Sequence, residues 1–133
     1  MLVNQIAVFF ENRTGRLLSL SKALSDSGID LVSLNIADTS DFGIVRMITS
    51  DNEKAAKALK EAGFVVKQTE LVSIEVDDTP GGLTKVLEAL GDSDIDIEYL
   101  YSYAKSNSSK ASILFKTSDI DKANKILKDK KLI

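Results

Sequence analysis

An internal duplication constrains the fold of this chain more than any other feature of its sequence. When the sequence is moved by 66 positions, residues 15–34 superimpose on residues 81–100 without a gap. The identical pairs include Gly15/Gly81, Leu24/Leu90 and Asp30/Asp96. Further along the offset becomes 68, because two residues are inserted in the polar stretch 105–110, and residues 49–51 superimpose on 117–119. The chain therefore contains two copies of one unit, and its fold must be built from that unit twice.

Each copy shows the order strand, helix, strand, strand, helix, strand. In the first copy, apolar and β-branched runs predict strands at residues 5–10, 29–36, 44–49 and 64–66. Leucines at helical spacing predict a helix over 17–24 that Gly28 ends, and residues 50–53 have the spacing of a capping box before a second helix. The apolar face expected for this second helix, which ends at Gly63, is Ala55, Ala58, Leu59 and Ala62. The second copy predicts strands at 71–76, 95–103 and 111–116 and helices at 83–90 and 119–130.

Two helices on one face of a four-stranded antiparallel sheet form the ferredoxin-like arrangement. The sequence therefore predicts an α+β protein with two ferredoxin-like βαββαβ repeats lying side by side, over residues 1–69 and 70–133. The strand that ends near Lys67 and the one that begins near Leu71 leave no room for a flexible linker. Only Lys131, Leu132 and Ile133 follow the last helix. We therefore expect the final strand of the second repeat to be stunted, absent or supplied by another chain.

The composition excludes several classes of function. The chain contains no Cys and no His, which removes thiolate and histidine catalysis, disulfides and the usual zinc and iron–sulfur ligands. We therefore predict no metal site and no cofactor. The net charge of −3 offers no general attraction for nucleic acid or anionic lipid. No apolar run approaches the length of about 20 residues that spans a membrane, and the N-terminus does not resemble a signal peptide, so we expect a cytoplasmic protein.

The first candidate binding site is the turn between the first strand and the first helix. A glycine at the start of a helix lets backbone N–H groups approach an anion, and the helix dipole favours negative charge there. Asn12 adds an amide that both donates and accepts hydrogen bonds, so a small carboxylate suits the turn. The alternative is that the glycine only makes a tight turn. The candidate residues are Asn12, Arg13, Thr14, Gly15, Arg16 and Leu17.

The corresponding turn of the second copy has less suitable chemistry for an anion. Pro80 lacks an N–H group, and the carboxylates of Asp77 and Asp78 repel negative charge. We therefore expect a second, weaker site here. Its residues are Asp78, Pro80, Gly81, Gly82 and Leu83.

Two further segments are candidates for ligand contact. Asp41, Phe42 and Gly43 follow a polar stretch between two strands, where Asp41 or nearby carbonyls could hold an ammonium group. The alternative is a turn with the glycine at positive φ. Three alternating tyrosines in the second copy share one sheet face, where they either pack with their polar tips toward water or line a pocket or an interface. They are Tyr99, Tyr101 and Tyr103, where the first copy has Ser33, Asn35 and Ala37.

These motifs resemble a known family, the ACT domain, here as a tandem pair without an attached enzyme. The resemblance rests on the βαββαβ plan, on the turns at 12–17 and 78–83, and on the strand entries at 28–31 and 94–97. It implies an allosteric regulatory protein that binds a free amino acid and regulates amino-acid metabolism. Because the second repeat lacks a full final strand to close its sheet edge, we also expect a homodimer or larger assembly. ACT domains commonly pair side by side and bind ligand at the seam. The resemblance implies one wall at Asn12 to Leu17 and the other at Tyr99 to Tyr103.

The function expected on this basis is non-catalytic. One alternative is an adaptor or regulatory subunit that binds a partner enzyme of amino-acid metabolism and no small molecule. A second is an acylphosphatase-like hydrolase using Arg13 and Asn12, although the loop is short and lacks the supporting glycine pattern. A third, an RNA-binding module, needs aromatic residues on both central strands, and strand 44–49 has none. We expect no nucleic-acid or membrane partner.

Overall fold

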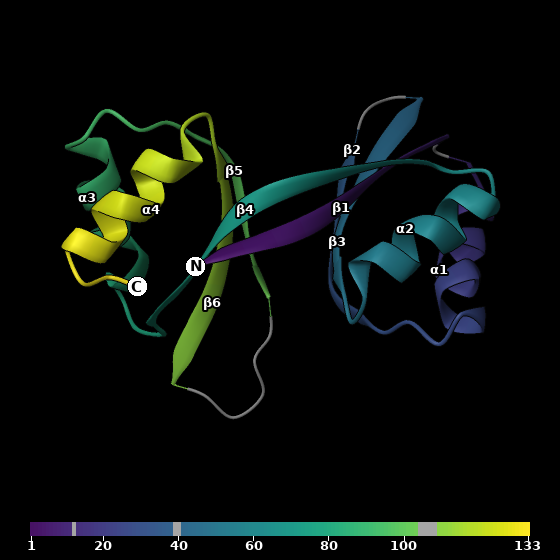
Figure 1. The fold of residues 1–133 in the computed structure, drawn as a ribbon, viewed down its shortest axis with the longest axis horizontal. Helices are drawn as coiled ribbons and strands as arrows, with labels where there is room; N and C mark the ends of the chain where they lie inside the picture. Colours follow the sequence, from purple (N-terminus) through teal and green to yellow (C-terminus); the bar gives the residue numbers. More distant parts are fainter. Residues whose placement is uncertain (12, 39–40, 104–108) are drawn as a thin grey trace. The chain divides into compact units, whose positions relative to one another are not determined.

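The computed structural model describes residues 1–11, 13–38, 41–103 and 109–133, which form an α+β fold (Figure 1). The first four strands and helices to appear along the chain are β1 (Leu2–Glu11), α1 (Arg16–Asp26), β2 (Leu31–Asp38) and β3 (Phe42–Thr49). They are followed by α2 (Asn52–Glu61), β4 (Val65–Asp77) and α3 (Gly82–Gly91). The last three are β5 (Ile97–Tyr103), β6 (Lys110–Thr117) and α4 (Ile120–Asp129). The chain divides into two compact units, Asn4–Thr69 and Met1–Val3 with Glu70–Ile133.

The first unit is a ferredoxin-like sheet covered by two helices. Its strands follow the order β2-β3-β1-β4, and β3 is antiparallel to both β1 and β2. In the register of β1 and β3, Ile6 is opposite Met47 and Val8 is opposite Val45. These four side chains pack in one core with buried residues of the helices, which include Leu20, Leu24, Ala55, Ala56 and Leu59. The helices α1 and α2 therefore lie on the same face of the sheet.

The second unit repeats this arrangement with β4, β6 and β5 as its long strands. Ile74 on β4 is opposite Ile113 on β6, and both pack in a core with residues of α3 and α4 such as Val86 and Leu127. The start of β1 lies beside β4 in this unit, where the Ser73 N–H donates to the Met1 carbonyl oxygen at 2.7 Å. Leu2 packs against the same core. The chain's own first residues thus take the position expected for the final strand of the second repeat, a solution that the sequence analysis did not include.

The duplication is visible in the backbone at each helix end. Gly15 and Gly81 precede α1 and α3 with φ of 89° and 87°. The carboxylates of Asp51 and Asp119 accept hydrogen bonds from the Lys54 and Lys122 N–H groups, each at 3.1 Å, and so cap α2 and α4. After these helices, Gly63 and Lys131 both adopt positive φ, at 88° and 55°. Equivalent positions therefore adopt equivalent conformations, as the two-copy alignment predicts.

Some predicted details of the elements are wrong. The strand expected at 64–66 and the one at 71–76 are a single strand, β4, which continues through the polar residues between them. The N-cap of α2 is Asp51 rather than Ser50, because the Ser50 hydroxyl accepts from the Asp30 N–H instead. Ala62 is exposed at the end of α2, while Ala56 is buried in its place. The predicted burial of Ala62 fails because the helix ends one residue before it.

Candidate functional site

The first turn connects β1 to α1 through a left-handed glycine. The Arg13 N–H donates to the Glu11 carbonyl oxygen at 2.9 Å, and the Arg16 N–H donates to that of Arg13 at 3.3 Å. Gly15 then takes φ of 89°, a conformation that favours glycine, although no atom would crowd a Cβ there. Asn12, a predicted binding residue, lies outside the described residues. The glycine is therefore required by the backbone conformation rather than by lack of space.

The helices that follow the two glycine turns begin differently from the other two helices. No side chain of the described residues caps α1 or α3, and neither has an acidic residue in its first turn. By contrast, Asp51 and Asp119 accept from the first-turn amides of α2 and α4. An aspartate at these two ends already supplies the negative charge that a helix N-terminus attracts. In the turns before α1 and α3, the Arg16 and Gly82 N–H groups donate to the Arg13 and Thr79 carbonyl oxygens, and no described carboxylate caps the helix. An anion at these turns would therefore face the amides that follow Arg16 and Gly82.

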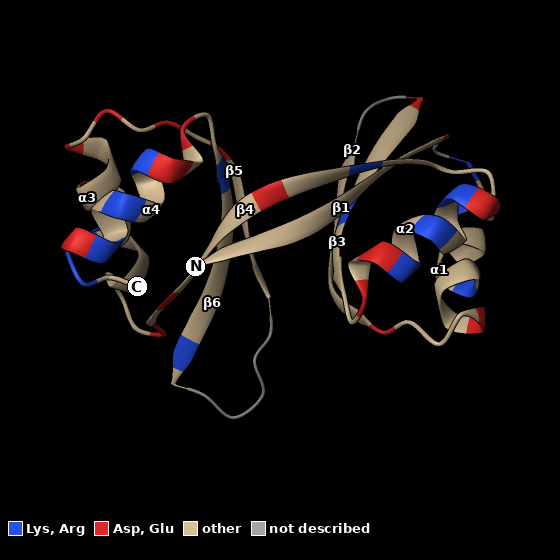
Figure 2. Cartoon of the chain, in the orientation of Figure 1, with Lys and Arg blue, Asp and Glu red and all other residues tan. Residues whose placement is uncertain are grey.

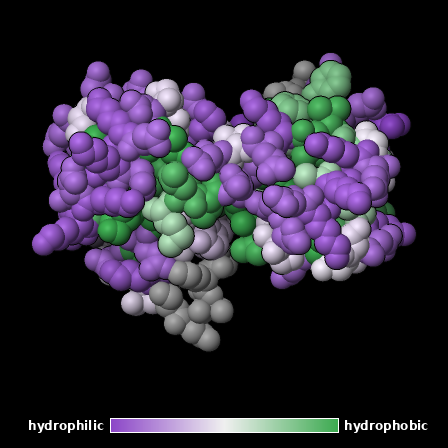
Figure 3. Space-filling model, viewed as in Figure 1, coloured by the Kyte–Doolittle hydropathy of each residue, from purple (hydrophilic) through white to green (hydrophobic). Residues whose placement is uncertain are grey.

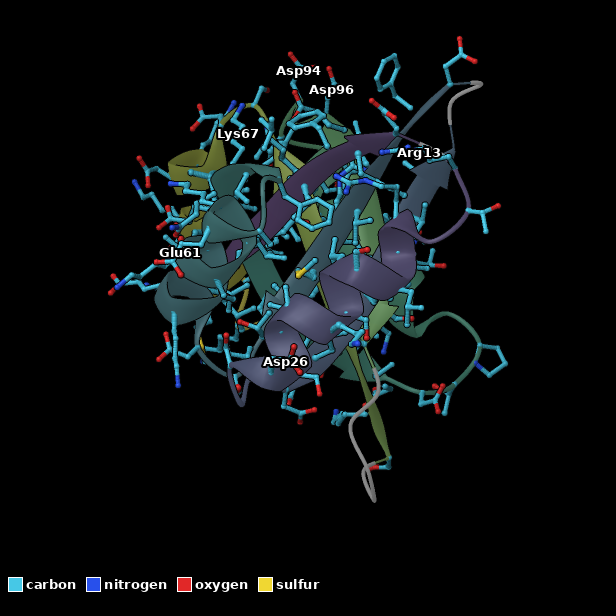
Figure 4. The ribbon with its side chains drawn as sticks, turned by 90° about the vertical axis from the view of Figure 1, so that its right-hand side faces the viewer. Arg13, Asp26, Glu61, Lys67, Asp94 and Asp96 are labelled. Atoms are coloured by element: carbon cyan, nitrogen blue, oxygen red, sulfur yellow. The ribbon has the colours of Figure 1, made fainter. Side chains whose placement is uncertain are left out.

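Both arginines of the first turn have partners within the unit. The Arg13 Nε atom lies 2.9 Å from the Glu11 Oε2 atom, in an exposed ion pair. Figure 4 shows Arg13 near the end of β1 and Asp26 at the opposite end of α1. The Arg16 guanidinium lies 4.4 Å from the ring centroid of Phe64, which is a cation–π geometry. Glu11 therefore offsets the charge of Arg13, whereas the Arg16 cation is held over an aromatic ring.

The other residues of the first turn are open to solvent. Thr14 and Gly15 are exposed, and Leu17 is 38% exposed although helical spacing placed it on the apolar face of α1. The turn thus presents one apolar side chain beside its polar backbone.

The segment Asp41–Gly43 lies at the same end of the sheet as the first turn. Phe42 is opposite Glu11 in the register of β1 and β3, and Gly43 is opposite Phe10. The predicted turn with Gly43 at positive φ is wrong, because Gly43 is part of β3 and is not among the described glycines with positive φ. A Cβ at Gly43 would lie 2.6 Å from the Cε1 atom of Phe10, so glycine makes room for that ring. Phe42 is 61% exposed, and Asp41 is exposed beside it.

The second turn has the same left-handed glycine conformation, but the backbone of Asp77 comes closer to the first residue of its helix. The alignment places Gly82 where the first copy has Arg16. A Cβ at Gly82 would lie only 2.0 Å from the Asp77 carbonyl oxygen, so this turn has no room for a side chain. Pro80 and Gly81 are exposed, whereas Leu83 packs against the core of the second unit. The second turn therefore leaves less space for a side chain at the first residue of its helix than the first turn does.

The charges of the second turn are partly neutralised. The Lys110 Nζ atom donates to an Asp77 carboxylate oxygen in an ion pair. This hydrogen bond, and then the attraction of the Lys110 charge, lower the pKa of Asp77 below its ordinary value. The Asp78 N–H donates to the Ser109 carbonyl oxygen at 3.0 Å. The sequence-based expectation that both carboxylates repel an anion therefore needs correction, because Lys110 offsets Asp77.

The three tyrosines occupy one face of the second sheet, as predicted. In the register of β5 and β6, Tyr101 is opposite Leu114, while the intervening Leu100 is opposite Phe115. Phe115 belongs to the core beneath α3 and α4. The tyrosines therefore lie on the face away from these helices. All three are half-buried; they are Tyr99, Tyr101 and Tyr103.

The structure groups the predicted residues into two sets. The first turn and Asp41–Gly43 meet at one end of the first unit. The second turn and the tyrosines belong to the second unit. A ligand site that combines the first turn with the tyrosines remains a prediction. Sequence reasoning missed Glu11, Phe64 and Lys110. Lys110 stands in the polar stretch 105–110, so its pairing with Asp77 had no local signal.

The described ranges lack two kinds of feature. No helix there is long and apolar enough to cross a membrane. No group of three or more His, Cys, Asp or Glu side chains in that part of the chain is arranged to hold a metal ion.

Two ferredoxin-like repeats, each with a left-handed glycine turn before its first helix, define a class of tandem regulatory domains. The family model described as ACT domain pair matches residues 1–133. The chain belongs to this family, and the family resemblance inferred from its turns is confirmed.

Solved structures agree with this assignment. Protein BT0572 from Bacteroides thetaiotaomicron is 42% identical, with a TM-score of 0.93 over 99% of this chain and 90% of that chain. The ligand-free regulatory subunit of aspartate kinase from Thermus thermophilus has a TM-score of 0.64 at 17% identity, over 97% of this chain and 96% of that one. The same subunit from Thermus flavus has a TM-score of 0.60 at 20% identity, over 97% and 94%. These two subunits share the fold. No curated protein matches the sequence.

Proposed function

We propose that this protein is a non-catalytic regulatory protein that binds a free amino acid at its paired ACT domains. The observation that carries the proposal is the contrast between the helix N-termini. The starts of α2 and α4 are capped by aspartate, whereas α1 and α3 follow glycine turns in which no described side chain caps the helix. The carboxylate of an amino acid suits an uncapped helix start, because backbone N–H groups and the helix dipole both favour an anion.

The first turn is the better candidate for this carboxylate. Its Gly15 turn has room for side chains at the following position, which is occupied by Arg16. The second turn is closed by the approach of Asp77 to Gly82 and carries the additional carboxylate of Asp78. In this proposal, Asp41 is the acidic group for the ligand's ammonium, and the tyrosine row is the second wall.

A thermal-shift screen against the twenty amino acids tests the proposal. A ligand at 100 times its Kd stabilises the folded state by about 2.7 kcal/mol. For this chain of 133 residues, that raises the melting temperature by roughly 8–13 °C. The expected result is a large shift for one amino acid or for one chemical class. If no amino acid changes the melting temperature, the binding proposal is wrong.

An adaptor that binds a partner enzyme is the second candidate, because the first unit exposes apolar side chains on an outer strand. β2 ends the strand order of this unit, and its Val32, Leu34 and Ile36 are each exposed by 43–44%. Such a surface suits a protein partner. Retention of a partner enzyme by the parent protein, and its loss with Leu34→Asp, would favour this function. A hydrolase is less well supported because Arg13 is paired with Glu11, and an acyl-phosphate hydrolysis assay tests it directly.

The outer strands also support a homodimer. β2 and β5 each end the strand order of their unit, and an open strand edge favours pairing with another chain. Sedimentation equilibrium should give twice the 14.5 kDa mass of the chain. A stable monomer at high micromolar concentration would contradict the homodimer.

A further inference from the structure

A pocket of about 790 Å³ opens in the second unit, and its lining includes no residue of either glycine turn. It lies where the start of β1, the middle of β4 and the end of α4 meet, close to both chain ends in Figure 1. This volume lies within the range of about 300–1,000 Å³ that is usual for small-molecule sites. All its lining residues belong to the second unit.

The lining combines apolar surface with basic side chains. Its apolar part is formed by Leu2, Val3, Ile74, Leu132 and Ile133. The space-filling view shows apolar side chains exposed between hydrophilic ones on this unit (Figure 3). The basic part is formed by Lys110, Lys128 and Lys131, with Glu75 as the acidic side chain of the lining.

Two of the three lysines are not neutralised. Lys110 pairs with Asp77, whereas Lys128 and Lys131 have no ion-pair partner among the described residues. Figure 2 shows blue positions along α4 and in the segment after it. The Asn124 side chain also lines the pocket and adds an amide group. An anion in the pocket would therefore meet two ammonium groups and a further donor.

Three members of the polar lining are specific to the second copy, whereas Lys128 corresponds to Lys60 of the first copy. In the two-copy alignment, Asn124, Lys131 and Lys110 replace Ala56, Gly63 and Phe42.

The turn conformation at position 131 does not explain why the second copy has a lysine where the first has a glycine. Lys131 has φ of 55°, a conformation that L side chains adopt at a cost and that the first copy gives to Gly63. A lysine at this position is therefore less favourable than a glycine for the backbone conformation. We propose that the pocket is a binding site for a small organic anion, with a carboxylate or phosphate head at Lys128 and Lys131 and an apolar body over Ile74 and Leu132.

An NMR titration of the whole chain with octanoate and with monooctyl phosphate tests this site. Either probe should shift the amides of residues 73–75 and 124–132, and the tighter one identifies the preferred head group. The uncharged 1-octanol should bind more weakly than both. Equal binding of 1-octanol, or no binding of either anion at millimolar concentration, would overturn the proposal.

Two variants separate the site from a general charge effect. Lys128→Gln should weaken binding of the anionic probe about two- to fivefold, as expected for a partly exposed ion pair. Lys125→Gln removes the same charge from the same helix outside the pocket and should leave the affinity unchanged. Equal losses in both variants would show that only overall charge matters.

Lys131→Gly distinguishes a loss of binding from a loss of folding. Glycine relieves the positive φ, so this variant should melt at a higher temperature than the parent while binding the probe more weakly. A more stable variant with unchanged affinity would remove Lys131 from the site.

Discussion

Replacing Gly82 with alanine should destabilise the protein, because the fold leaves no room for a methyl group at this position. The Cβ atom would lie 2.0 Å from the carbonyl oxygen of Asp77 and 3.1 Å from its carbonyl carbon. Both are backbone atoms, so relief requires the end of β4 or the start of α3 to move. Such overpacking costs about 1–3 kcal/mol. For 133 residues, each kcal/mol lowers the melting temperature by roughly 3–5 °C.

Gly91 provides the matched control in the same helix. No atom lies within 4 Å of a Cβ at Gly91, so Gly91→Ala should be neutral or stabilise by up to about 1 kcal/mol. Both variants can be compared by thermal melting and urea unfolding, followed by far-ultraviolet circular dichroism. If Gly82→Ala melts at the temperature of the parent, the close approach of Asp77 is not a constraint of the folded protein. The contrast between an open first turn and a closed second turn would then lose its basis.

Three further predictions concern ligand binding and charge. Asn12→Ala should cost roughly 1.5–3 kcal/mol of amino-acid binding, about a ten- to hundredfold loss, by removing a hydrogen bond to a charged group. Asp78→Ala should weaken binding much less, or improve it. Calorimetry measures the affinity of both variants, and melting without ligand controls for folding. A larger loss with Asp78→Ala than with Asn12→Ala would mean that the second turn is the primary site. Amino-acid affinity should stay nearly constant from about pH 5.5 to 7.5, because the chain has no His and no unperturbed side chain titrates in that range. A tenfold change in measured Kd across it would contradict this. Lys110→Ala should raise the pKa of Asp77 toward its ordinary value, as carboxyl NMR can show. Because pairing lowers this pKa in the folded state, the stability it adds is present above the ordinary Asp pKa and is lost as pH falls through the folded value. An unchanged Asp77 pKa would mean that the ion pair does not form in solution.

The sequence predicted those parts of the fold that depend on local chemistry. Gly15 and Gly81 marked the two turns because a helix entry of this shape requires positive φ. The alternation of Tyr99 to Tyr103 was sufficient to place them on one face, since strand periodicity needs no tertiary information.

Features that depend on distant residues were not predictable in this way. The polar residues 67–70 suggested a break between two strands, yet they continue β4, because strands pair through backbone groups that every residue carries. The sequence around Gly43 is typical of a turn, yet Gly43 lies in β3, where glycine makes room for the Phe10 ring. The contact between Arg16 and Phe64 joins positions 48 apart, with no local signal.

The position of residues 1–3 has a consequence for the order of folding. Met1 pairs with Ser73 across 72 positions, whereas the core of the unit Asn4–Thr69 is formed by residues within its own range. During synthesis this unit can form first, while residues 1–3 remain unpaired until the part of β4 around Ser73 has been synthesised. Closing so long a loop is slow relative to local pairing. The second unit should therefore be completed last, and a delay or mutation near Ser73 should trap a chain that is half folded with its first residues unpaired.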